Sequence, residues 1–231
     1  SDEFNEAMKE AVREKLDDED DGLVIGELVT SHPNLIDNIW GHERPPIPHN
    51  AFRVHPLEYA GMSVADKVAK IREEMNNKKA TMTVFCTLDD VAYLLNMRCK
   101  GDVDTCPVGI AYATVTRDDI TLYCDARKVE SSDVQEHLSD VKIKPYEDIV
   151  GDIQQHANES NTNNKIWIDK SRSNLALVTP IPEKALVDCQ NPVTPMKACK
   201  NEKELEGMRK AHLVDGAAMA NFIAWLEEKL V

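Results

Sequence analysis

Residues 81–96 have the sequence TMTVFCTLDDVAYLLN, which predicts a β-strand followed directly by an α-helix. The first six residues are rich in β-branched side chains, which favour a strand. Thr87 is then the predicted N-cap of the helix. Asp89 and Asp90 occupy its first turn, where the helix dipole alone explains an acidic pair.

Further strands and helices flank this stretch. Ser63, followed by Asp66, is the predicted N-cap of a helix that runs to about residue 76. Two strands joined by a turn are predicted at 109–116 and 120–124. Short helices are predicted from 132 and over 146–156, and strands over 165–169 and 185–189. Because strands are interspersed with helices, we predict an α/β domain whose sheet is covered by helices.

Proline-rich segments bound this predicted domain. Residues 41–50 (GHERPPIPHN) have no apolar period and predict a linker, and residues 190–195 form a second break. Before the linker, a helix is predicted over 3–16 and a strand over 23–28, whereas LIDNIW (35–40) is too short to assign. After the second break, one long helix runs to the end, starting at a capping box of Asn201 and Glu204.

Composition excludes several classes of protein. The chain has 231 residues, of which 42% are hydrophobic and 29% are charged, which is typical of globular proteins. Its net charge of −14 argues against nucleic acid and anionic membranes as partners. Residues 1–21 hold ten acidic and three basic side chains, and we interpret them as a solvated face rather than a docking tail. The six scattered cysteines predict reduced thiols and a cytoplasmic location.

Three histidines lie close together in and after the proline-rich linker. His42, His49 and His55 lie near Asp37 and Glu43, but their spacing matches no metal-binding template, so we interpret them as exposed linker residues.

Cys99 and Cys106 bracket the polar loop CKGDVDTC, which could form a disulfide or a thiol site; we take inert cysteines as the default. His137 and His156 are predicted on helix surfaces, and His212 is predicted buried on the apolar face of the last helix. No nucleophile, base and orienting group assemble, so we assign no catalytic, cofactor-binding or metal-binding residue.

A resemblance to a known family begins at the last helix. KACKN (197–201) and ELEGMRKAH (204–212), extended by Asp215 and the triplet WLE (225–227), resemble the segment that opens the catalytic domain of Xaa-Pro aminopeptidases. LIDNIW with ERP (43–45) resembles the junction between the first two domains of that family. Asn96 to Arg98 resembles its N-L-R-G piece, and residues 107–113 resemble P-V-F-x-S-Y-A.

The resemblance implies a domain plan. Residues 1–40 correspond to the tail of a first creatinase-like domain, 41–50 to a linker and 51–190 to a whole second N-terminal domain, with a mixed sheet flanked by helices. Residues 191–231 correspond to a linker and the first helix of a truncated pita-bread catalytic domain. The metal ligands of the family, which bind a pair of ions that is usually manganese, lie beyond this segment.

The chain departs from the family pattern at two places. Cys99 replaces the glycine of N-L-R-G, and Gly109, Ile110 and Ala111 replace the bulkier F-x-S stretch. These changes affect the expected packing or pocket wall but leave the resemblance intact.

The resemblance implies a non-catalytic N-terminal segment of a metal-dependent enzyme that removes the residue preceding proline from small peptides. This chain alone is expected to be inactive, with the catalytic domain of the parent, and a second copy in a homodimer, as partners. Two alternatives stay open. Creatinase-like domains also serve as peptide-binding or histone-binding modules, and a shortened relative could regulate the full enzyme.

Overall fold

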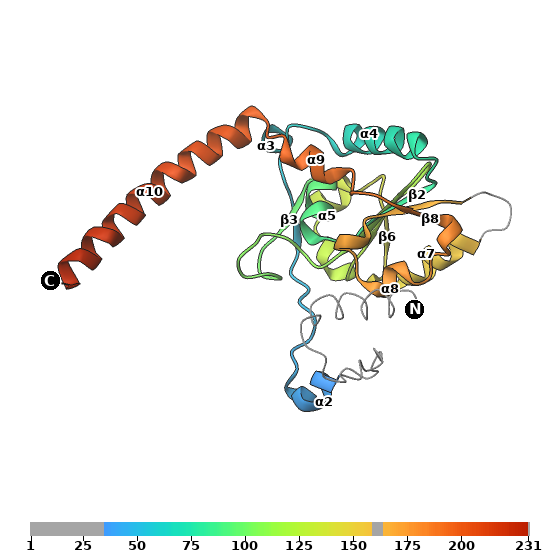
Figure 1. Cartoon of the computed structure of the whole chain (residues 1–231), viewed down its shortest axis with the longest axis horizontal. Coiled ribbons are helices and arrows are strands. Elements are labelled where there is room, and N and C mark those ends of the chain that lie inside the picture. Colours follow the sequence, from blue (N-terminus) through green and yellow to red (C-terminus); the bar gives the residue numbers. More distant parts are fainter. Residues whose placement is uncertain (1–34, 159–163, 231) are drawn as a thin grey trace, which may run out of the picture. The chain divides into compact units, whose positions relative to one another are not determined.

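The computed structural model describes residues 35–158 and 164–230 (Figure 1). The chain divides into two compact units, Ser1–Ile47 and Pro48–Val231. No helix within the described ranges is both long enough and apolar enough to cross a membrane.

The described part of the first unit contains helix α2 (Leu35–Trp40) and the 3₁₀ turn η1 (Gly41–Glu43). The segment LIDNIW, too short to assign from sequence, is therefore helical. The helix predicted at 3–16, the strand predicted at 23–28 and the acidic segment lie outside the described residues.

The second unit contains a six-stranded sheet in the order β6-β5-β4-β2-β7-β8. β4 is antiparallel to β2 and β5, whereas the pairs β2–β7, β7–β8 and β5–β6 are parallel, so the predicted mixed sheet is confirmed. The strands are β2 (Met82–Phe85), β4 (Tyr112–Thr116), β5 (Ile120–Tyr123), β6 (Lys142–Lys144), β7 (Ile166–Ile168) and β8 (Leu186–Asp188).

A separate two-stranded ladder pairs β1 (Phe52–Val54) with β3 (Met97–Cys99) in antiparallel register. Neither strand was predicted from the sequence, and β6 was missed as well. The ladder matters because it brings residues 52–55 beside the turn that follows α5 (Leu88–Leu94).

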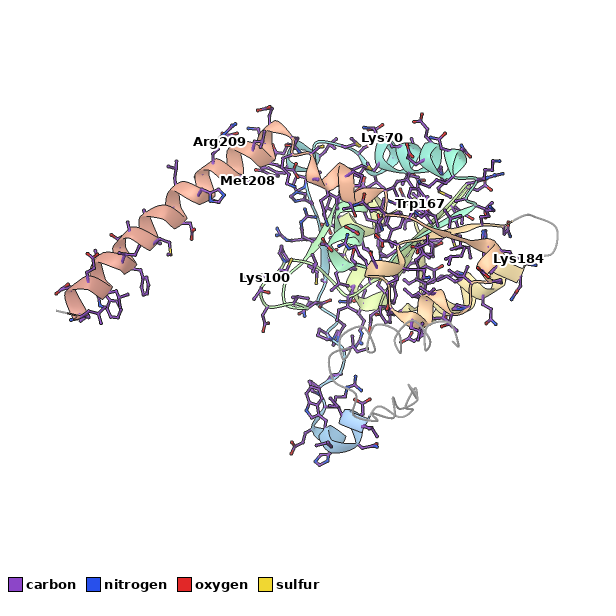
Figure 2. All side chains as sticks on the ribbon, viewed as in Figure 1. Lys70, Lys100, Trp167, Lys184, Met208 and Arg209 are labelled. Atoms are coloured by element: carbon purple, nitrogen blue, oxygen red, sulfur yellow. The ribbon has the colours of Figure 1, made fainter. Side chains whose placement is uncertain are left out.

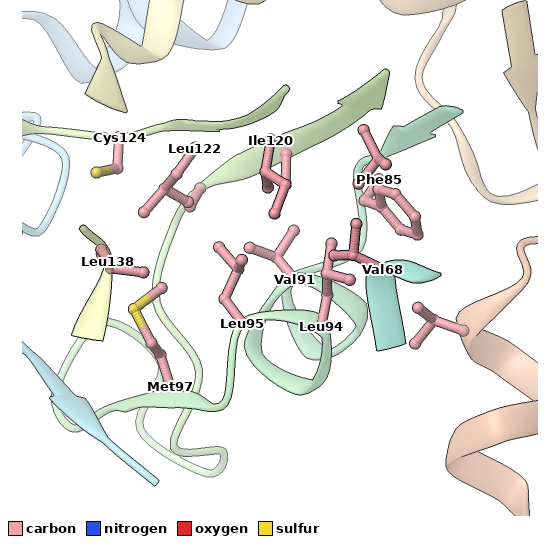
Figure 3. Close-up of a cluster of buried hydrophobic side chains, with 14 of the residues drawn as sticks. Val68, Phe85, Val91, Leu94, Leu95, Met97, Ile120, Leu122, Cys124 and Leu138 are labelled. Carbon is pink, nitrogen blue, oxygen red and sulfur yellow. The ribbon is translucent and has the colours of Figure 1, made fainter. Parts of the chain in front are cut away.

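Helices cover both faces of the large sheet, as predicted. On the first face lie α4 (Val64–Asn77), α5 and α6 (Ser132–His137), and on the second lie α7 (Ile149–Asn158) and α8 (Leu175–Val178). Alternation along each strand divides the core, because successive side chains point to opposite faces. Trp167 of β7 packs on the first face, and its neighbours Ile166 and Ile168 pack on the second. Figure 3 shows part of the first cluster, with Phe85 beside Val68 of α4.

The predicted N-termini of the helices are confirmed in part. Ser63 Oγ accepts a hydrogen bond from Asp66 N (3.1 Å), as the capping pattern predicted. Thr87 is the N-cap residue of α5, as predicted, but its side chain makes no capping hydrogen bond, and its buried Oγ1 has no partner among the described residues. The helix predicted over 146–156 begins as the 3₁₀ turn η3 (Tyr146–Asp148) and continues as α7.

The remaining helices carry the chain from the sheet to its C-terminal part. α3 (Leu57–Ala60) precedes α4, and α9 (Val193–Ala198) follows β8. α9 begins within the second proline-containing break (190–195), yet Val193 is fully buried in the first core cluster. The long helix α10 (Glu202–Leu230) then begins beside α3 (Figure 1).

Candidate functional site

A network of ion pairs lies where β2 ends and α5 begins. Asp90 is fully buried, and its carboxylate accepts hydrogen bonds from Lys197 Nζ (2.8 Å) and Arg172 Nη1 (3.3 Å). Lys197 also pairs with Asp89. Burial alone would lower the pKa of Lys197, but its hydrogen bonds to the two aspartates outweigh burial and raise it.

The helix dipole is therefore only part of the reason why Asp89 and Asp90 lie at the start of α5, and the prediction that the dipole suffices is wrong. No local pattern relates position 172 to position 90, so the role of Arg172 could not be predicted.

Asn201 fastens the first turn of α10 to the domain. Its Oδ1 accepts from Glu204 N (2.9 Å), while Glu204 Oε2 accepts from Asn201 N (2.8 Å). These reciprocal bonds are the predicted capping box. The Nδ2 of Asn201 also donates to Tyr59 O in α3 (3.0 Å). Residues Lys197 and Asn201 of the KACKN motif thus tie α9 and α10 to α5 and α3.

Two neighbouring pockets, of about 660 and 380 Å³, lie between α4 and α9. Lys70, Pro195 and Met196 line both pockets, and Trp167 lines the larger one (Figure 2 labels Lys70 and Trp167). Apolar surface is combined there with the charged side chains of α4.

Large apolar side chains along α10 are not covered by any other described residue. Figure 2 shows Met208 and Arg209 on this helix. His212, predicted to be buried, is exposed, because no described residue packs against its side of the helix. Large exposed apolar side chains recur along the helix: Met208, Leu213, Val214, Met219, Phe222, Ile223, Trp225, Leu226 and Leu230. A helix with this surface requires a partner to bury it.

The two departures from the family pattern are neighbours in space. A Cβ atom added at Gly109 would lie 2.3 Å from Phe52 Cε1 and 2.9 Å from Cys99 Cβ. The Phe52 ring therefore occupies the space that a side chain at position 109 would need. The absence of a side chain at Gly109 therefore leaves room for Phe52 of β1.

A buried ion pair closes the loop that Cys99 and Cys106 bracket. The side chains of Asp102 and Lys128 are both buried and pair with each other. Asp102 also accepts hydrogen bonds from Ile110 N (2.9 Å) and Asn50 Nδ2 (3.1 Å). Both cysteines are free thiols, and burial raises the pKa of Cys99. A raised pKa disfavours the reactive thiolate, which agrees with the inert assignment.

The histidines do not assemble a metal site. His42 belongs to the first unit, and His49 and His55 belong to the second. Within the described parts of the chain, no group of three or more His, Cys, Asp or Glu side chains could hold a metal ion. His137 and His156, predicted on helix surfaces, are half-buried instead. His137 Nε2 donates to Leu95 O (2.8 Å), and His156 Nε2 lies 2.8 Å from Thr81 Oγ1, so both histidines serve packing between elements.

Comparison with known proteins relates most of the chain to one family. Residues 43–204 match the Creatinase/Prolidase N-terminal domain. Over 214 residues the chain is 39% identical to a probable Xaa-Pro aminopeptidase P of Pyrenophora teres f. teres, and over 212 residues it is 39% identical to one of Talaromyces stipitatus. Each match covers 89% of this chain and 32% of the relative. The chain therefore spans about a third of the length of these curated relatives.

Solved structures agree with the sequence comparison. A crystal structure of X-prolyl aminopeptidase from Caenorhabditis elegans, described as a cytosolic enzyme with a di-nuclear active site, matches with a TM-score of 0.75 and 31% identity. That match covers 84% of this chain and 32% of the other. Xaa-Pro dipeptidase from Bacillus anthracis matches 71% of this chain and 44% of its own, with a TM-score of 0.54 at 10% identity, which shows a common fold.

Proposed function

Because the chain belongs to the Creatinase/Prolidase N-terminal domain family, we propose that it is the non-catalytic N-terminal segment of a metal-dependent Xaa-Pro aminopeptidase. The longer enzyme would release an N-terminal residue that precedes proline from small peptides. The observation that carries the proposal is the 39% identity to Xaa-Pro aminopeptidase P relatives over 89% of this chain.

The described residues support a non-catalytic role for this segment. They hold no metal-binding group, and the buried polar networks at Asp90 and Asp102 are satisfied by structural partners. We therefore place the metal pair, expected to be manganese, in the two thirds of the relatives that this chain does not match. A two-metal site there would activate water and polarise the scissile carbonyl. The residues of this chain would restrict access to that site by their bulk.

Helix α10 supports a partner within the same longer protein. The family match ends at residue 204, whereas α10 continues to Leu230 and exposes large apolar side chains along its length. We propose that α10 is the first helix of the catalytic domain and that this domain buries its apolar side chains. A cytosolic location and a homodimer are proposed by analogy with the cytosolic relative from Caenorhabditis elegans and with the family.

The proposal is tested with two proteins. The first is the purified 231-residue chain, which should release nothing from an Xaa-Pro peptide in the presence of Mn²⁺. The second is a chimera in which this chain replaces the matching third of the Pyrenophora teres relative. The chimera should cleave the peptide and should protect α10 from limited proteolysis, whereas α10 of the isolated chain should be cut.

The two readouts separate the parts of the proposal. Metal-dependent cleavage by the isolated chain would show that it carries its own active site. A chimera that folds but leaves α10 as sensitive to protease as in the isolated chain would contradict burial of this helix by a catalytic domain. The unmodified relative from Pyrenophora teres is the control for activity and protease resistance.

A further inference from the structure

The small ladder formed by β1 and β3 places two arginines directly opposite each other. Arg53 pairs in register with Arg98, so their side chains leave the ladder on the same face. Like charges in this position repel, and a protein normally avoids or compensates them. Neither arginine forms an ion pair with any described residue. This arrangement is unusual in a chain whose net charge is −14.

Arg98 is held in one orientation by the backbone. Its Nη1 donates to Met97 O (2.8 Å) and Ala92 O (3.2 Å), the latter near the end of α5. Both bonds use the same nitrogen, so the Nε and Nη2 donors remain for another acceptor. A guanidinium fixed in this way is suited to binding a planar or tetrahedral oxyanion with two parallel hydrogen bonds.

Asn96, in the turn before β3, forms hydrogen bonds with two further residues that carry basic side chains, His55 and Lys67. Its carbonyl accepts a hydrogen bond from His55 N (2.7 Å), and its Oδ1 accepts one from Lys67 Nζ (2.5 Å). Lys67 is fully buried, and its other acceptor is the carbonyl of Tyr93 (2.6 Å). Both acceptors of Lys67 are thus neutral, and no carboxylate of the described residues pairs with it. His55 directly follows β1, and the charges of Arg98, Arg53 and Lys67 all act on its ring.

The electrostatics agree with this geometry. Burial and the neighbouring Arg98 lower the pKa of Lys67 to about 8 and also lower the pKa of His55. Burial, followed by the charge of Arg53, lowers the pKa of Arg98. Glu204, in the first turn of α10, is the acid that opposes these shifts. Glu204 supplies one negative charge against the three cationic side chains of Arg53, Arg98 and Lys67, so the cluster keeps an excess of positive charge.

We propose that Arg53, His55 and Arg98 form a binding site for an oxyanion, a carboxylate or a phosphate group, with buried Lys67 adding positive potential behind it. This site goes beyond the proposed function, which requires no ligand at the ladder of β1 and β3. An oxyanion would form charge-assisted hydrogen bonds with both guanidinium groups and remove the repulsion across the ladder.

The test is a calorimetric titration of the intact 231-residue chain with inorganic phosphate, and separately with succinate, at constant ionic strength set by NaCl. We expect saturable binding of at least one of them, and the better ligand identifies the source of the oxyanion. Arg53→Gln should bind about tenfold more weakly, as expected when one charge-assisted bond is lost. Arg53 is exposed, so this variant should fold normally.

The matched control is Arg117→Gln, since Arg117 is an exposed arginine in the turn between β4 and β5. It should bind as the wild type does. A second readout follows the ¹⁵N–¹H signal of Arg98 Nε, which should shift on titration in the wild type and in the control. Binding of neither anion, or equal affinity in the Arg53 and Arg117 variants, would overturn the proposal.

Discussion

The side chain of Asn201 occupies the space beside Gly61 where any other residue would have its Cβ. An ideal Cβ at Gly61 would lie 2.5 Å from Asn201 Nδ2, and Gly61 has a left-handed backbone with φ of +71°. The turn after α3 therefore requires glycine for two reasons. Through this contact the direction in which α10 leaves the domain depends on a residue 140 positions earlier in the chain.

Gly61→Ala should disrupt the contact between the turn after α3 and Asn201, and so destabilise the start of α10. The new methyl group would push Asn201 from Tyr59 O and strain the backbone, so we expect the free energy of unfolding to fall by about 1–3 kcal/mol. Hydrogen exchange at the amides of Glu204 and Leu205 should also become faster. Urea unfolding and exchange mass spectrometry measure the two effects.

Gly151→Ala is the control for this substitution. Gly151 lies in α7, and a Cβ there meets no atom within 4 Å. Because alanine favours a helix over glycine, this variant should be more stable by about 0.5–1 kcal/mol and should leave exchange in α10 unchanged. Equal effects of the two substitutions would show that the contact with Asn201 is unimportant.

Gly109 and Phe52 should be energetically coupled. Gly109→Ala drives a methyl group against the Phe52 ring, so a loss of about 1–3 kcal/mol is expected. In a Phe52→Leu background the ring is gone, and the same change at position 109 should cost less. A double-mutant cycle by urea unfolding measures the coupling energy, for which we expect at least about 1 kcal/mol. Additive losses would mean that the two residues were not matched to each other.

Local patterns in the sequence were sufficient to predict most of the sheet. The β-branched run at 81–86 gave β2, and the capping pattern at Ser63 gave α4, because both signals lie within a few residues. β1 and β3 escaped detection because their three-residue strands are defined by pairing with each other. The mixed arrangement of strands followed from the resemblance to the family rather than from periodicity.

Side-chain networks were harder to predict than elements. Lys197 and Asp90 are 107 positions apart, and no local pattern links them. The apolar face of α10 was visible in the sequence, but whether His212 is buried depends on what packs against the helix. The basic cluster around Arg53 was missed because Arg53 and Arg98 come from the unpredicted ladder, and no local pattern links them to Lys67 on α4.

The buried pair of Asp102 and Lys128 should make stability depend on acid pH. Burial alone would raise the pKa of Asp102, but hydrogen bonds from Lys128, Ile110 N and Asn50 outweigh it and lower the pKa. A lowered pKa adds stability that is present above the unfolded value of 3.8 and is lost as the pH falls through the folded value. Asp102→Asn should abolish this part of the pH dependence, measured by urea unfolding between pH 2 and 6.

At neutral pH the same variant leaves the Lys128 charge buried without its partner. We expect a loss of about 3–5 kcal/mol, and a smaller loss when Lys128→Met is added, since no charge is then buried. Asp118→Asn, at an exposed position in the turn after β4, should have little effect. If Asp102→Asn and the double variant were equally unstable, the pair would not be the source of the effect.

Lys67 should make the free energy of unfolding rise as the pH increases through the alkaline range. Its pKa is about 8 in the folded chain and 10.5 in the unfolded chain. Between these values the unfolded chain binds more protons, so the free energy of unfolding contributed by this group rises with pH.

Lys67→Met removes the titration. It also deprives Tyr93 O and Asn96 Oδ1 of their hydrogen-bond donor, which lowers stability by an amount independent of pH. The difference in unfolding free energy between wild type and Lys67→Met should therefore grow by about 1–3 kcal/mol from pH 7.5 to 10. Urea unfolding across this range measures it, and a difference that stays constant would show that Lys67 is charged throughout in the folded chain.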